Sequence, residues 1–170
     1  MFLSPAREGE TIMSDLTAVV IVIVVIVVAI GISAWWKGRL LSQGTIIQRA
    51  SDFVEYAEIF TTGPINNEQY AAALKALDLK NTGTSMEGNT KAVKFSGVYF
   101  SASLHCTEQT ETNSVYRFEF DKWKTKYGRP SFENEMNMLL TRVEKMFVQL
   151  DPNTQVSTVK NEIKTKRSIL

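Results

Sequence analysis

The chain has 170 residues, of which 44% are hydrophobic and 22% are charged, and its formal net charge at pH 7 is +1. This length accommodates one modest domain, and so small a net charge creates no long-range field to attract nucleic acid or an acidic substrate. Because Cys106 and His105 are the single Cys and the single His, a disulfide framework and a zinc site built on Cys and His clusters are both excluded.

The first distinctive segment is an uncharged run from Leu16 to Trp36, rich in Val and Ile. As a helix rising ~1.5 Å per residue it spans roughly 31 Å, close to the ~30 Å of a bilayer's hydrocarbon core. Backbone amides in lipid need internal partners, so we predict a transmembrane helix over 16–36. A buried strand is shorter than this run. A cleaved signal peptide has a basic flank and a shorter apolar stretch, so the sequence favours an uncleaved anchor.

Residues 1–15 are expected to form a short tail before the span. Met13-Ser14-Asp15-Leu16 resembles an ordinary protein start, and the codons for Gly9-Glu10 are purine-rich at the spacing of a bacterial ribosome-binding site. Our hypothesis is that residues 1–12 belong to an over-extended reading frame.

Basic residues near the span predict its orientation. Arg7 alone precedes it, whereas Lys37, Arg39 and Arg49 follow it. Positive charge is retained in the cytoplasm, so we expect a single-pass protein of the cell membrane whose C-terminal domain is cytoplasmic. At the membrane interface the expected anchors are Trp35, Trp36, Lys37 and Arg39.

After a juxtamembrane linker at 37–44, the pattern predicts a soluble domain over 45–152. Apolar residues spaced by three or four predict a first helix with the buried face Ile46, Ala50, Phe53, Ala57 and Phe60. A second helix is expected from Asn66, a good N-cap, with Tyr70 and Leu74 on its apolar stripe. The composition of 80–90 predicts a loop.

The apolar period then changes from 3.6 to 2, which indicates strands over 93–104 and 116–120. Gly97 is the expected site of a bulge or tight bend. A last helix, with Ser131 as its cap, is expected to run to Leu150. Residues 153–170 form a basic tail in which Val156, Val159 and Ile163 predict a weak amphipathic helix. The fold class predicted is therefore a single transmembrane helix followed by a small α+β domain, in the order helix, helix, antiparallel strands, helix.

No catalytic, cofactor-binding or metal-binding residues are nominated by the sequence. His105 and Cys106 are adjacent in a predicted strand, so their side chains point to opposite faces and cannot act as a base and a nucleophile together. Glycine-rich phosphate loops are missing from the sequence. Acidic pairs such as Glu133 and Glu135 are explained by a helix start.

The most distinctive cluster follows the last predicted strand, where basic and aromatic residues alternate. Along a continuing strand the three Lys share one face, while Trp123 and Tyr127 share the other. This composition suits anionic headgroups or a protein partner; phosphates with stacked bases fit it less well. The alternative is a solvated strand end with Trp123 packed on the core. The candidate contact residues are Lys122, Trp123, Lys124, Lys126, Tyr127 and Arg129.

These features together lead to a functional hypothesis. We expect a membrane-anchored interaction or scaffold module, without enzyme activity or cofactor, whose partners are the bilayer and a surface of lipid or protein. A subunit of a bacterial envelope or transport assembly is one such role. The first alternative is an extracytoplasmic ligand-binding domain on an uncleaved signal anchor, and the second is a membrane-tethered enzyme with a carboxylate-based site.

Overall fold

The computed structural model of the chain describes residues 8–161 and 168–169. The chain divides into two compact units, with the division between Gln43 and Gly44. The first unit is a long helix, α1 (Glu8–Ser42), and the second is a domain of strands and helices. Arg7 and Ile163, on which the sequence interpretation drew, and most of the basic tail lie outside the described ranges.

Among the described residues, α1 is the one helix long and apolar enough to cross a membrane, over Ala18–Ser42 with a mean hydropathy of 3.1. Its Val and Ile side chains between Val19 and Ile32 are all 52% to 62% exposed. A helix that is apolar all round has no face suited to water. α1 also continues through most of the predicted linker, because Lys, Arg and Leu are good helix formers and a single Gly38 costs only about 1 kcal/mol.

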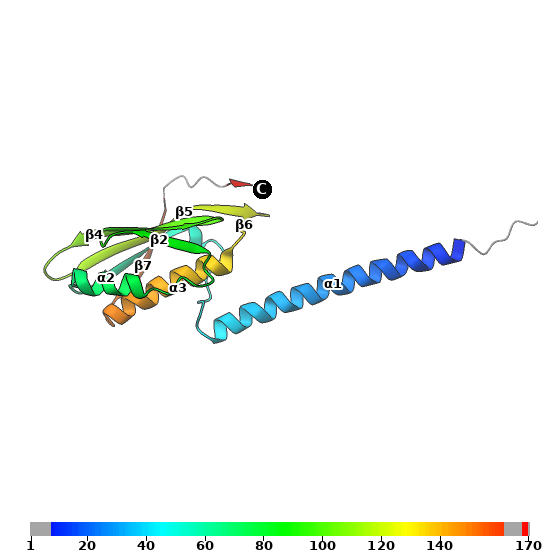
Figure 1. The fold of residues 1–170 in the computed structure, drawn as a ribbon, viewed down its shortest axis with the longest axis horizontal. Helices are drawn as coiled ribbons and strands as arrows, with labels where there is room; N and C mark the ends of the chain where they lie inside the picture. The colour runs from blue at the N-terminus through cyan, green and yellow to red at the C-terminus, as the bar shows by residue number, and fades with distance from the viewer. Residues whose placement is uncertain (1–7, 162–167, 170) are drawn as a thin grey trace, which may run out of the picture. The chain divides into compact units, whose positions relative to one another are not determined.

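The domain is built on a sheet whose main strands run in the order β2-β3-β4-β5-β1-β7 and all pair antiparallel (Figure 1). Two further short strands pair with β5, β6 (Arg129–Pro130) antiparallel and β8 (Ser168–Ile169) parallel. The bounds of the main strands are β1 (Tyr56–Thr62), β2 (Thr84–Gly88), β3 (Ala92–Gly97), β4 (Phe100–Gln109), β5 (Ser114–Lys126) and β7 (Gln155–Lys160).

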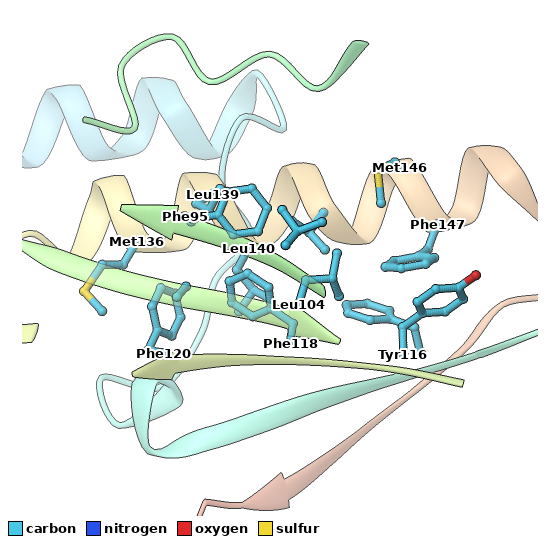
Figure 2. Close-up of a cluster of buried hydrophobic side chains, with 14 of the residues drawn as sticks. Phe95, Leu104, Tyr116, Phe118, Phe120, Met136, Leu139, Leu140, Met146 and Phe147 are labelled. Carbon is cyan, nitrogen blue, oxygen red and sulfur yellow. The ribbon is translucent and has the colours of Figure 1, made fainter. Parts of the chain in front are cut away.

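Helices α2 (Asn67–Ala76) and α3 (Glu133–Leu150) cover one face of this sheet (Figure 1). Aromatic rings join the two helices to the sheet: Tyr70 of α2 lies 4.8 Å from Tyr116 of β5 and 6.0 Å from Phe147 of α3, measured between ring centroids. Figure 2 shows Leu139, Leu140 and Phe147 among the side chains of the strands. The domain is thus of the α+β class, and its hydrophobic core cluster, as far as the structure describes it, lies between Phe53 and Leu150.

The first predicted helix, over Ile46–Phe60, is wrong. Residues 44–52 are irregular, Phe53–Glu55 form a short 3-10 helix (η1), and β1 follows, paired with β5 on one side and β7 on the other. Tyr, Ile, Phe and Thr dominate β1 and favour strands, and pairing on both sides outweighs the apparent helical period. Phe60 does face the core, where it stacks on Phe147 at 4.6 Å between ring centroids.

Three short-range expectations near the strands have different outcomes. β2 lies inside the predicted loop 80–90, and β7 lies where a weak amphipathic helix was expected in the tail. The bend at Gly97 is confirmed, because this residue ends β3 before the turn into β4. A Cβ atom at Gly97 would lie 2.7 Å from the backbone oxygen of Gly83, so a larger residue does not fit there.

The two predicted helix starts also differ in outcome. The cap of α2 is confirmed, since the Asn66 side chain accepts a hydrogen bond from the backbone N–H of Glu68 at 2.9 Å. α3 occupies the predicted region, but its N-cap is Phe132, which forms no side-chain cap, and not Ser131. Its apolar stripe alone therefore specifies this helix.

Candidate functional site

The first part of the candidate site is the turn between β5 and β6. Lys126 pairs with Arg129 across the strands, so Tyr127 and Gly128 form a two-residue turn. Both have positive φ, 51° at Tyr127 and 76° at Gly128, as a type I′ turn requires. Glycine adopts this conformation freely, whereas a bulky residue is strained there by about 1 kcal/mol or more. Tyr127 is nevertheless 94% exposed and outside the core cluster, and its ring lies 5.6 Å from the ammonium of the neighbouring Lys126.

The turn between β3 and β4 lies beside this strand end. It carries Val98, which is 77% exposed, and Tyr99, which is 43% exposed. The backbone N–H of Lys124 donates to the Tyr99 carbonyl at 3.0 Å, and the Lys124 ammonium lies 5.4 Å from the centre of the Tyr99 ring. Tyr99 in turn stacks on Phe132. The two turns therefore meet at one end of the sheet.

We call this surface the hairpin rim; it consists of Val98, Tyr99, Lys122, Lys124, Lys126, Tyr127 and Arg129. Lys122, Lys126 and Arg129 are exposed, and Lys124 is half-buried. Within the described part of the chain none of these four cations forms an ion pair. The rim thus combines unneutralised positive charge with exposed apolar side chains, a combination that suits an anionic, partly apolar surface.

Trp123 does not belong to the rim. It is 3% exposed and part of the core cluster, opposite Phe100 on β4. The alternation predicted along this segment thus places Trp123 inward, and the turn carries Tyr127 away from that face into solvent. Conversely, sequence reasoning missed Val98 and Tyr99. In a continuous strand Val98 lies on the same face as buried Phe100, and Gly97 is the one sequence signal for the turn that exposes it.

Beside the hairpin lies a hollow of about 560 Å³. Its lining includes Lys126, Tyr127 and Trp123 as well as Asp52 and Glu55. Since both signs of charge meet in it, the hollow favours neither a cation nor an anion.

His105 and Cys106 show no catalytic arrangement. His105 is exposed and lies opposite Arg117, whereas Cys106 is half-buried opposite Tyr116. Burial raises the pKa of the Cys106 thiol, and its sulfur is 3.6 Å from the Glu108 carbonyl oxygen. A thiol with a raised pKa is a poor nucleophile at neutral pH.

A cluster of buried charges lies against the segment that follows α1, and sequence reasoning missed it. Arg49 brings its guanidinium to Glu58 of β1, with 3.6 Å between Nε and Oε1, and to Glu144 of α3, with 2.5 Å between Nη2 and Oε2. Burial, and then the Glu144 carboxylate, raise the pKa of Glu58 to about 8 against the opposing effect of Arg49. These charges are far apart in the chain, so no local pattern reveals them.

The anchor residues lie on α1. Trp35 and Trp36 are 61% and 52% exposed, and the Arg39 guanidinium lies 5.7 Å from the centre of the Trp35 ring. Lys37 is exposed nearby on the same helix. Comparison with protein families, with curated proteins and with solved structures finds no match to this chain.

Proposed function

We propose that this protein is a single-pass membrane protein whose C-terminal domain is a binding or scaffold module that contacts anionic lipid headgroups through the hairpin rim. The observation that carries the proposal is the rim itself: an exposed tyrosine held at positive φ among cations that form no ion pair within the described residues. Strained, exposed residues persist where function requires them.

The apolar surface of α1 supports the membrane anchor. Its Val and Ile side chains find no cover within the described part of the chain, and an exposed apolar surface of this length is stable in lipid. Tryptophan and arginine at its C-terminal end are typical of a membrane interface.

Lipid fits the rim better than nucleic acid does. Each basic residue near an anionic surface contributes about 1 kcal/mol, and Val98 and Tyr127 are suited to the headgroup region. Base stacking, by contrast, requires a platform of several aromatic rings. Trp123 is buried, which removes the strongest stacking residue of the segment.

A cytoplasmic domain is the second part of the proposal. Arg49 is engaged in buried ion pairs, so the charge bias after the span rests on Lys37 and Arg39. Two fusions after Leu170, one to a fluorescent protein that matures only in the cytoplasm and one to a phosphatase active only outside, test this directly. Fluorescence without phosphatase activity is expected. Phosphatase activity alone would favour the extracytoplasmic ligand-binding alternative.

Vesicle binding tests the rim. The fragment 44–170 is mixed with zwitterionic vesicles and with vesicles containing anionic lipid, and sedimentation measures the bound fraction. We expect binding to the anionic vesicles alone, weakening as salt rises. The triple variant Lys122→Glu, Lys124→Glu, Lys126→Glu should lose it.

The matched control reverses three exposed lysines elsewhere, Lys75, Lys91 and Lys94, to the same net charge. This control variant should retain most of the binding. Equal loss in both variants would show that net charge alone acts and would refute a specific role of the rim.

A further inference from the structure

The segment Gly44–Asp52, which follows α1 in the chain, has no regular structure but is held on the domain at several points. The Lys145 ammonium donates to the Gly44 carbonyl at 2.5 Å, and the Asn137 side-chain amide donates to the Ile47 carbonyl at 2.7 Å. Ile46 is only 2% exposed. Two of these contacts come from α3, so the segment is fastened along that helix.

Arg49 is the centre of this attachment. Besides its ion pairs with Glu58 and Glu144, its Nη1 donates to the Thr141 hydroxyl at 2.9 Å and to the Asn137 side-chain oxygen. One side chain of the segment therefore contacts both β1 and α3. All three ionic side chains are largely buried, with exposed fractions of 9% to 16%.

The hydrogen bonds of this cluster are incomplete when both carboxyl groups are ionised. Oε2 of Glu58 is buried and accepts no hydrogen bond from the described residues, whereas Oε2 of Glu144 is engaged by Arg49 Nη2. Both carboxyl groups contact the same guanidinium, so they lie close to each other. Two carboxylates beside one guanidinium also leave a buried net charge of −1. A proton on Glu58 removes this net charge and gives its carboxyl group a hydrogen to donate.

We propose that Glu58 and Glu144 hold one proton between them, and that this acid pair, with Arg49, forms a proton-dependent clasp that fastens the segment Gly44–Asp52 to the domain. Opening the clasp exposes the carboxyl groups to water and releases the proton. The step is a proton transfer to solvent and needs no other reactant.

The direction of the pH dependence follows from the raised pKa of Glu58. The closed clasp keeps its proton up to about pH 8, and opening removes burial, the largest cause of this raised pKa, so the pKa of Glu58 falls. The clasp is therefore tightest at low pH and loosens as the pH rises to about 8, by up to tenfold in the opening constant per pH unit.

The other groups around Glu58 are accounted for. A second hollow beside Glu58 and Arg49 is also lined by Asp52 of the segment and by Tyr56 of β1. The neighbour on β7 is Thr158, which is uncharged, and α3 contributes Glu144.

The clasp sets the length of chain between α1 and the sheet. Closed, the chain joins the domain at Gly44; open, it joins at Phe53, which frees nine residues or roughly 30 Å of extended chain. If the proposed function holds, an opened clasp lets the hairpin rim reach a wider area of the bilayer. The clasp itself does not depend on lipid binding.

Thiol accessibility in the full chain, in detergent micelles without vesicles, measures clasp opening even when it is rare. In a Cys106→Ser background, Ile46→Cys places a thiol at a buried position of the segment, and Gln48→Cys places one at an exposed position two residues later. The ratio of their modification rates at each pH corrects for the ordinary ionisation of thiols.

We expect the Ile46→Cys thiol to become more accessible between pH 5.5 and 8, by several-fold to tenfold per pH unit. Glu58→Gln, which keeps a donor to Glu144 but does not titrate, should abolish this slope; Glu144→Gln should abolish it as well. Glu87→Gln, at an exposed site on β2, should leave it intact. A flat profile in the parent, or an unchanged slope in both cluster variants, would overturn the proposal, whatever the outcome of the vesicle and topology tests.

Discussion

The hairpin rim and the clasp use similar side chains in opposite surroundings. At the rim, Lys122, Lys126 and Arg129 are exposed to water and form no ion pair with the residues that the structure describes. In the clasp, Arg49 is largely buried and depends on Glu58 and Glu144 for its compensation. The rim charges therefore contribute little to folding and are available for binding, whereas the clasp charges are bound within the fold.

The largest effect is expected from removing the central cation of the clasp. Arg49→Met leaves two buried carboxyl groups without their counter-charge, which costs about 3–5 kcal/mol. Urea unfolding of the 44–170 fragment measures this loss. Arg129→Met at the rim should change the free energy of unfolding by no more than about 0.5 kcal/mol. Equal losses in the free energy of unfolding from the two substitutions would show that rim and clasp charges contribute alike to folding.

A smaller effect is expected from pH. Because the folded domain raises the pKa of Glu58 to about 8 from 4.5, its contribution to stability is complete below pH 4.5 and is lost as the pH rises to 8. The slope is at most about 1.4 kcal/mol per pH unit. Urea midpoints at several pH values, compared between the parent fragment and Glu58→Gln, isolate this contribution. A parent curve that matches the Glu58→Gln curve at every pH would contradict it.

The smallest effect on stability is expected from replacing the tyrosine of the rim turn. Tyr127→Gly relieves the positive φ and should stabilise the domain by up to about 1 kcal/mol. The same substitution removes the exposed ring and should weaken binding to anionic vesicles. If Tyr127→Gly lowered stability instead, the ring would have a packing role that its 94% exposure does not indicate.

Much of the architecture follows from local patterns. The uncharged run predicts α1, the 3.6-residue stripe from Met136 to Leu150 predicts α3, and alternation predicts β4 and β5. Asn66 caps α2 as its chemistry requires. In these elements propensity, periodicity and burial agree, so sequence and structure coincide.

The failures come from contacts that are distant in sequence. β1 was mistaken for a helix because its strand character depends on pairing with β5 and β7, which follow much later in the chain. The clasp joins Arg49 to a helix more than 80 residues away, as the Arg49–Asn137 hydrogen bond shows. Five of the seven rim residues are visible in the sequence as a basic and aromatic run, whereas Val98 and Tyr99 join it only through the sheet register.

The most direct test of the account uses the full chain in nanodiscs. A polarity-sensitive fluorophore is attached at Tyr127→Cys in a Cys106→Ser background, and its emission is compared between anionic and zwitterionic lipid. We expect a blue shift in anionic nanodiscs that high salt reverses. Emission equal to that of the water-exposed probe in both lipids would contradict membrane contact by the hairpin rim.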